Sequence, residues 1–260
     1  MINKKNIIRA SDDDETKIFI SKSCDSYMRA FNTGRTFFSK FATPLEQKII
    51  ESRFPKNDVE ISFFGGYDDS ERNIIRFSGD AVFDDALSYP VCAVSVRAKS
   101  REVFSHRDYL GSVLGLGIKR ELIGDIVIRS EDAVIFCLEE IAPYIEDNLF
   151  KIGHATVNVT RLDDISDIVI ERKFENLSLT VSSMRADCVV SAVCNVSRSG
   201  ASELIERGLV TLCYEVLASK DRLVNPGDVI SVRGKGKFMI GDEIKPTKKG
   251  RLHIDVKKYI

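Results

Sequence analysis

The segments that decide the fold of the C-terminal third are Met184-Arg-Ala-Asp187, Ser197-Arg-Ser-Gly-Ala201 and Asn225-Pro-Gly-Asp228. Apolar residues at helical spacing follow the first segment and predict a short helix there. A serine of the second segment can cap another helix, which is expected to end at Gly208. The third segment has the composition of a turn and leads into a strand at 229–232, after an earlier strand at 209–212. These patterns predict a small module of two helices followed by strands.

Basic side chains gather around this module and suit it to binding a phosphate backbone. A guanidinium group can hold phosphate oxygens in a bidentate manner, and a serine hydroxyl can contribute when it does not cap a helix. We expect this set of side chains to form the primary RNA surface. The residues predicted to contact RNA are Arg185, Ser197, Arg198, Ser199, Lys220, Arg233, Lys235 and Lys237.

The module resembles the S4-type RNA-binding domain of ribosomal and RNA-modifying proteins. That family carries the patterns Arg-x-Asp, Ser-Arg-x-x-Ala, Gly-x-Val and Pro-Gly-Asp-x-Ile. The matching residues of this chain are Arg185, Asp187, Ser197, Arg198, Ala201, Gly208, Val210, Pro226, Gly227, Asp228 and Ile230. One departure follows Val210, where the family usually has an asparagine and a small or basic residue. This chain has Cys213, Tyr214 and Glu215 there, and the acidic residue is unfavourable for an RNA contact by that turn.

The composition is that of an ordinary soluble globular protein. The 260 residues are 43% hydrophobic and 30% charged, and the chain is long enough for two or three domains. No apolar run approaches the ~20 residues that span a bilayer, and residues 1–10 are too polar for a signal peptide. The six cysteines include no Cys-x-x-Cys pair, which predicts buried thiols, no metal and no cofactor. We expect a cytoplasmic monomer without membrane association.

Charge is distributed unevenly along the chain. The formal net charge is −1, but residues 175–260 carry 14 Lys and Arg against 10 Asp and Glu, a balance of +4 that leaves −5 for the remainder. Counterion release on phosphate contact favours the basic end. Because this excess is modest, we expect weak, salt-sensitive affinity for bare RNA. We therefore expect a partner that is recognised by its shape as well as its charge, such as a folded ribonucleoprotein surface.

The first two-thirds of the chain alternate helical and strand-like patterns. Thr43-Pro44-Leu45-Glu46 is typical of a capped helix start, and strands are expected at 59–64 and 73–78. The later strands and helices, expected to interleave as in a ferredoxin-like or RNA-recognition-motif (RRM) sandwich, are 91–98, 107–116, 125–129, 133–137, 139–149 and 154–160. The predicted fold class is α+β. Its parts are an N-terminal α/β domain at 1–78, an RRM-like domain at 79–165, an S4-type domain at 180–242 and a basic C-terminal strand at 243–260.

The segment 106–120 contains three glycines and can place basic side chains around one helix. Glycines let a backbone approach a phosphate closely, and the basic side chains supply charge. The alternative is that the apolar residues of this segment build a core while its charges face water. Tyr67 and Tyr109 can likewise either stack on bases or pack inside the protein. The candidate RNA contacts of the segment are His106, Arg107, Lys119 and Arg120.

Three separated signatures resemble the YlmH family of bacterial S4-type RNA-binding proteins. They are the segment 106–126, the pattern Gly65-Gly66-Tyr67 with Glu71-Arg72, and Thr247-Lys-Lys-Gly-Arg251. With the S4-type module, they extend the resemblance over nearly the whole chain. Lys248, Lys249 and Arg251 are candidates for a second phosphate clamp, the alternative being a solvated tail.

The resemblance implies a non-enzymatic factor that binds rRNA and tRNA on the large ribosomal subunit. Its pathway would be the quality control that extends stalled nascent chains with alanine tails. One alternative is an RNA-modifying enzyme of the pseudouridine synthase or methyltransferase type, because S4-type modules are often appended to such enzymes. We expect no enzymatic activity, because the segment before the module has no convincing cofactor loop. The other alternative is a cell-division adaptor, because members of the family are encoded beside cell-division genes.

Overall fold

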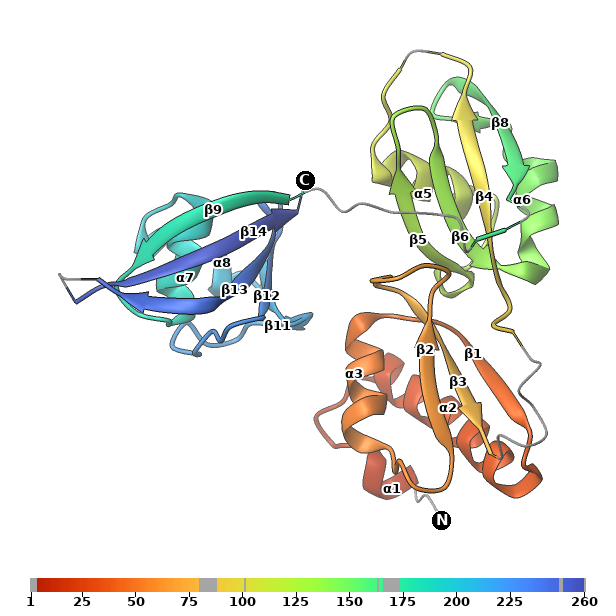
Figure 1. Cartoon of the computed structure of the whole chain (residues 1–260), viewed down its shortest axis with the longest axis horizontal. Coiled ribbons are helices and arrows are strands. Elements are labelled where there is room, and N and C mark those ends of the chain that lie inside the picture. The colour runs from red at the N-terminus through yellow and green to blue at the C-terminus, as the bar shows by residue number, and fades with distance from the viewer. Residues whose placement is uncertain are drawn as a thin grey trace. The chain divides into compact units, whose positions relative to one another are not determined.

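A computed structural model of the chain describes residues 4–79, 88–100, 102–162, 164–165, 174–247 and 250–259. It has a mixed α+β fold, as the sequence predicts, and every strand pair among the described residues is antiparallel. The chain divides into two units, Met1–Ile170 and Glu171–Ile260 (Figure 1). Among the described residues, no helix is long and apolar enough to cross a membrane.

The first unit begins with a three-stranded sheet covered by helices. Its elements are α1 (Lys4–Ile7), α2 (Asp14–Thr33), β1 (Thr36–Ala42), α3 (Pro44–Arg53), β2 (Glu60–Phe64) and β3 (Asn73–Ser78), with the strand order β1-β3-β2. The predicted cap of α3 is present, because the Thr43 hydroxyl accepts from the Glu46 amide and the Glu46 carboxylate accepts from the Thr43 amide. Buried side chains such as Tyr27, Ile50 and Phe77 join the helices to the sheet.

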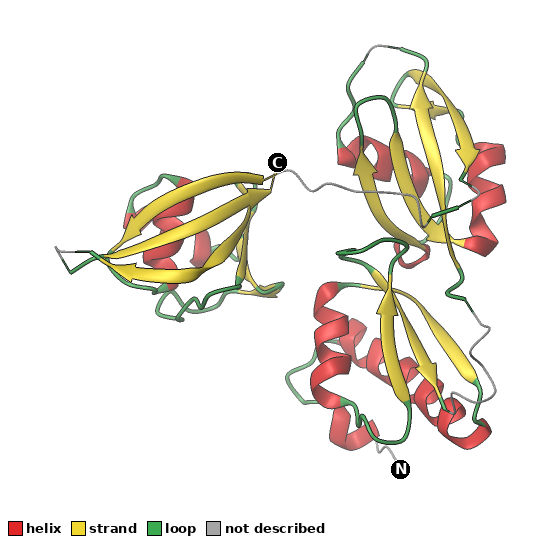
Figure 2. Ribbon diagram, viewed as in Figure 1, coloured by secondary structure: helices red, strands yellow, loops and turns green. Residues whose placement is uncertain are grey.

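The second sheet of this unit has five strands and two covering helices. Its elements are β4 (Val91–Ala98), α5 (His106–Gly115), η1 (Arg120–Leu122), β5 (Ile123–Ile128), β6 (Ala133–Leu138), η2 (Glu139–Ile141), α6 (Ala142–Asn148), β7 (Lys151–Ile152) and β8 (Ala155–Arg161). The strand order is β5-β6-β4-β8-β7. Val113 of α5 and Ile145 of α6 share one buried cluster with Ile135 of β6, so both helices cover the same face of the sheet (Figure 2).

The opposite face of the five-stranded sheet packs against the three-stranded sheet. Val134 and Phe136 of β6 point away from the helices and share a cluster with Phe41 of β1 and Ile74 of β3. All six residues of β6 are therefore buried. A strand buried on both faces reads as a continuous apolar run, as Ala133–Leu138 does. The helix-free face of this sheet is thus largely occupied by the protein itself.

The second unit is one six-stranded sheet with two helices. Its elements are β9 (Phe174–Val181), α7 (Ala186–Cys194), α8 (Arg198–Glu206), β10 (Val210–Leu212), β11 (Glu215–Val216), β12 (Val229–Val232), β13 (Gly236–Pro246) and β14 (Leu252–Tyr259). The strand order is β11-β10-β12-β13-β14-β9. Both helices and the strands β10 and β12 fall where the sequence patterns predict them. Val190 and Ala201 of the helices pack on Ile230 and Phe238 of the sheet.

The edge strand β9 is one of the elements that the sequence patterns do not predict. It pairs along its whole length with β14, from Phe174 opposite Tyr259 to Val181 opposite Leu252. Leu177, Leu179 and Val181 face the core of this unit. Their alternation with polar residues is the signal that identifies the strand. The C-terminal residues predicted as a basic strand lie inside this same sheet, as the end of β13 and as β14.

Candidate nucleic-acid interface

Two of the predicted RNA contacts in the second unit, Arg185 and Arg198, hold one buried carboxylate. Arg185 precedes α7 and donates to both oxygens of Asp187, at 3.2 and 3.1 Å. Arg198 begins α8 and donates from Nε to Asp187 Oδ2 at 2.9 Å. These hydrogen bonds hold the pKa of Asp187 well below its ordinary value. Through Asp187, the two guanidinium groups therefore join the starts of the two helices. A phosphate would bind groups that already have hydrogen-bond partners within the protein.

The exposure of these two arginines differs. Arg185 also forms an ion pair with Asp221, and 34% of its side chain is exposed. In Arg198, 57% of the side chain is exposed. Arg198 is therefore the more accessible of the two for an external phosphate, although its contact with RNA stays a prediction.

The serine hydroxyls at the start of α8 are also engaged. Ser197 is the N-cap residue of this helix, and its hydroxyl accepts from the Gly200 amide at 3.1 Å. The hydroxyls of Ser197 and Ser199 lie 2.9 Å apart and share a hydrogen bond. Both side chains are exposed at the helix start. Both hydroxyls thus form hydrogen bonds at the start of α8, and an RNA contact would have to use the same oxygen atoms.

Lys220, Arg233 and Lys235 are predicted contacts whose side chains remain uncommitted among the described residues. Arg233 and Lys235 lie in the tight turn between β12 and β13, where Gly234 and Gly236 adopt positive φ angles of 79° and 128°. All three basic side chains are exposed. Within the described part of the chain, none of them has an ion pair or a side-chain hydrogen bond. The hairpin therefore presents two full charges to the solvent.

Lys237, two residues further on, is held by aromatic rings. Its ammonium group lies 5.0 Å from the ring centroid of Tyr214 and 4.8 Å from that of Tyr259. It also donates to the Tyr214 hydroxyl at 3.3 Å. A cation over an aromatic face is attracted by the ring quadrupole. The charge of Lys237 thus stabilises the sheet. In the sequence, Arg233, Lys235 and Lys237 simply alternate with other residues, so this structural role cannot be seen there.

The candidate contacts in the first unit also divide into exposed and committed groups. Arg107 and Lys119 are exposed, and neither side chain has a polar partner among the described residues. Arg120 donates to the carbonyl oxygens of Ile123 and Gly124, the latter at 3.1 Å, and burial lowers its pKa to about 10. Desolvation and the nearby charge of Arg120 lower the pKa of His106. Arg107 and Lys119 are thus the accessible cations of this segment.

The two glycine-containing signatures of the first unit meet at Asp125. Its carboxylate accepts from the Tyr67 hydroxyl at 2.8 Å and from the amides of Glu71 and Arg72 at 2.6 and 3.2 Å. The Arg72 side chain donates in turn to the carbonyl oxygens of Ile123 and Phe41, each at 3.1 Å. This network joins both sheets of the unit and brings the two signatures together at one carboxylate.

Tyr67 and Tyr109, the two tyrosines considered for base stacking, are packed inside the protein. Only 8% of Tyr67 and 4% of Tyr109 is exposed. Tyr67 stacks on Phe136 with ring centroids 4.8 Å apart, and Tyr109 meets Phe104 edge to face. The packing alternative therefore holds for both tyrosines, and neither ring is available to a base.

The C-terminal candidates are described only in part. Arg251 is exposed, and its amide and carbonyl both bond to Thr247 across the turn before β14. Lys248 and Lys249 lie outside the described residues. The second phosphate clamp stays a prediction for all three.

Comparison with known proteins adds two matches in sequence. Residues 89–166 match the family model described as "Putative RNA-binding domain in YlmH", and these residues span the five-stranded sheet with α5 and α6. The chain is also 29% identical over 222 residues to the Ribosome-associated protein quality control protein P2 of Bacillus subtilis, covering 85% of this chain and 86% of that protein. Residues 89–166 are thus similar to the RNA-binding domain of YlmH proteins. Among solved structures, the cell division protein ylmH from Streptococcus pneumoniae is 20% identical, with a TM-score of 0.47 over 60% of this chain and 95% of that one.

Proposed function

We propose that this protein is a member of the YlmH family and a non-enzymatic RNA-binding factor of the cytoplasm that acts on the large ribosomal subunit. It would bind rRNA and tRNA there, as a monomer, in the quality control of stalled peptidyl-tRNA complexes. Two matches support this role: the RNA-binding domain model over residues 89–166 and the similarity to a ribosome-associated quality control protein over most of the chain.

We propose that the second unit binds RNA as an S4-type domain. Its support is the pair α7 and α8 on an antiparallel sheet, with the Arg185, Asp187 and Arg198 side chains joining the two helices. The observation that carries the proposal is the exposed, unpaired charge of Arg233 and Lys235 at the hairpin between β12 and β13. Unpaired cations at a tight turn can reach a phosphate backbone without first breaking an internal ion pair.

We propose that residues 89–166 form an RRM-like domain with an unusual binding mode. The strand-helix-strand-strand-helix-strand order and the central order β5-β6-β4-β8 support a ferredoxin-like arrangement. RRM domains stack bases on aromatic residues of the open sheet face. Here Phe136 of that face is buried against the three-stranded sheet. RNA would therefore have to contact the helices, loops or edges of this domain instead.

The test is sedimentation of cell lysates through sucrose gradients, comparing the wild-type protein with an Arg233→Glu, Lys235→Glu double variant. We expect the wild type on free large subunits and the double variant mainly at the top of the gradient. Lys245 and Lys257 are exposed lysines on the strands of the same sheet, so their double reversal to Glu is the matched control and should still co-sediment. A wild-type protein that stays at the top even at low salt would reject this proposal in favour of the adaptor or enzyme alternatives.

A further inference from the structure

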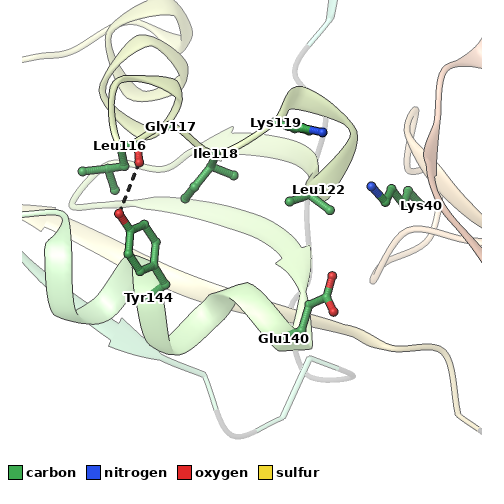
Figure 3. A pocket seen from close by; sticks show the side chains of 8 residues that line it. All are labelled: Lys40, Leu116, Gly117, Ile118, Lys119, Leu122, Glu140 and Tyr144. Atoms are coloured by element: carbon green, nitrogen blue, oxygen red, sulfur yellow. Dashed lines mark hydrogen bonds between the residues drawn. The ribbon is translucent and has the colours of Figure 1, made fainter.

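An open cavity of about 420 Å³ lies in the first unit beside the glycine-containing loop that follows α5 (Figure 3). This volume falls within the range of about 300–1,000 Å³ that small-molecule pockets occupy. The residues that line it are Lys40, Leu116, Gly117, Ile118, Lys119, Leu122, Glu140 and Tyr144. Four of them belong to the segment 106–120, which resembles YlmH proteins and takes no part in the Asp125 network.

One wall of the cavity is apolar and carries an aromatic ring. The side chains of Leu116 and Ile118 lie near the ring of Tyr144 (Figure 3). The Tyr144 hydroxyl donates to the Leu116 carbonyl at 3.3 Å, which links α6 to the loop after α5. Even so, 48% of Tyr144 is exposed. A half-exposed aromatic ring held in place on an apolar wall is suited to stacking with a planar group.

The other side of the cavity is charged. Lys40 is paired with Glu121 at 2.5 Å, so its charge is already balanced. Lys119 and Glu140 are both exposed, and neither side chain has a polar partner within the described ranges. A carboxylate only accepts hydrogen bonds and an ammonium only donates them. The cavity therefore offers a planar apolar contact together with one free acceptor and one free cation.

This combination matches a nucleotide whose base presents hydrogen-bond donors. Guanine has two adjacent donors, N1–H and the N2 amino group, which a carboxylate can accept as a pair. The phosphate of the same nucleotide would meet the ammonium of Lys119. Because the open face of this sheet is buried against the three-stranded sheet, the ring of Tyr144 replaces the usual stacking surface. We propose that the cavity holds one unstacked guanine nucleotide of an RNA strand, with the base on Tyr144, its donor edge on Glu140 and its phosphate on Lys119. This inference rests on the proposed function.

The test measures binding of the full-length protein to labelled hexauridine and to three hexanucleotides that carry one guanosine, adenosine or cytidine at the third position. Fluorescence polarisation at fixed low salt gives each Kd. Since a paired contact to a base edge is worth at least about 1 kcal/mol, we expect the guanosine strand to bind about fivefold tighter or more. Glu140→Gln should abolish this preference by removing half of the acceptor pair. Tyr144→Ala should weaken all four strands.

The chain offers a matched control for each variant. Glu139 is exposed next to Glu140 but does not line the cavity, so Glu139→Gln should keep the guanosine preference. Phe150 is an aromatic residue that is 63% exposed and lies outside the cavity, so Phe150→Ala should leave binding unchanged. Tyr144→Phe keeps the ring and should bind nearly as the wild type does. Circular dichroism of each variant separates a folding defect from a lost contact.

Photo-crosslinking locates the base directly. With 6-thioguanosine at the third position, peptide mapping should place the crosslink in α6 or in the loop at 116–119. Equal affinity for all four strands, or a crosslink confined to the second unit, would overturn the cavity assignment. If ribosome co-sedimentation persisted in that case, the proposed function would stand without the cavity. If the protein bound neither the hexanucleotides nor ribosomes, both proposals would be rejected.

Discussion

The Nε atom of Arg198 lies 2.9 Å from Oδ2 of Asp187, a carboxylate that is almost fully buried between the starts of α7 and α8. A guanidinium group that looks like an RNA contact in the sequence is therefore also a structural group. Removing it would disturb the packing of the two helices as well as the proposed RNA surface. Experiments on this unit must separate these two effects, and the predictions below are chosen to do so.

Replacing Asp187 with Asn should destabilise the protein by about 2 kcal/mol at pH 7, because two guanidinium groups lose a charged partner. The folded-state pKa of Asp187 is lowered, so its stabilising contribution is fully present above the unfolded-state value of about 4 and is lost as pH falls towards the folded-state value. The difference between wild type and variant should therefore shrink at pH 3. Urea unfolding at both pH values measures it. Asp221→Asn, at an exposed partner of Arg185, should cost under about 1 kcal/mol.

Two lysines of one hairpin should behave differently in RNA binding. Lys235→Gln removes an unpaired charge and should lower the slope of log K against log salt by about one, without changing stability. Lys237→Gln removes an ammonium held between Tyr214 and Tyr259 and should cost about 1 kcal/mol of stability while changing the slope little. Filter binding across a salt series and urea unfolding measure the two effects. Equal slope changes would show that Lys237 also contacts phosphate.

The Asp125 network should be energetically coupled. Asp125→Ala leaves the Tyr67 hydroxyl and two backbone amides without their acceptor and should cost about 3 kcal/mol. Tyr67→Phe should cost about 1 kcal/mol in the wild type and much less beside Asp125→Ala. A double-mutant cycle from urea unfolding gives this coupling. Strictly additive costs would contradict the network described here.

Two glycine-to-alanine changes should have opposite effects on stability. Gly111 lies within α5, and a Cβ atom there would meet nothing within 4 Å, so Gly111→Ala should stabilise the protein by about 0.5–1 kcal/mol. Gly66 has a φ of 104°, and a Cβ atom there would lie 2.4 Å from the Phe136 ring. Gly66→Ala should therefore cost about 3 kcal/mol or more. Thermal unfolding checks both changes. A destabilising Gly111→Ala would mean that α5 needs its flexibility.

The sequence by itself determined the local structure of this protein. The cap of α3, both helices of the second unit and the strand after the Asn225–Asp228 turn depend on residues within a few positions of one another. The strand β9 was missed because its sequence is weakly apolar, and its pairing partner β14 lies more than 70 residues away. The apolar run at 133–137 did predict the strand β6, but it did not show that a second sheet covers the other face of this strand.

Only the tertiary structure decided which cations are free. Arg185, Arg198 and Lys237 are as basic in the sequence as Arg233 and Lys235, yet the first three are paired within the fold. Their partners are a buried carboxylate and two aromatic rings, brought to them by helix pairing and sheet register. A basic side chain is available to RNA only when it is not already paired with another group of the fold. Long-range packing decides which groups lie beside a side chain, and local composition and residue spacing do not show this.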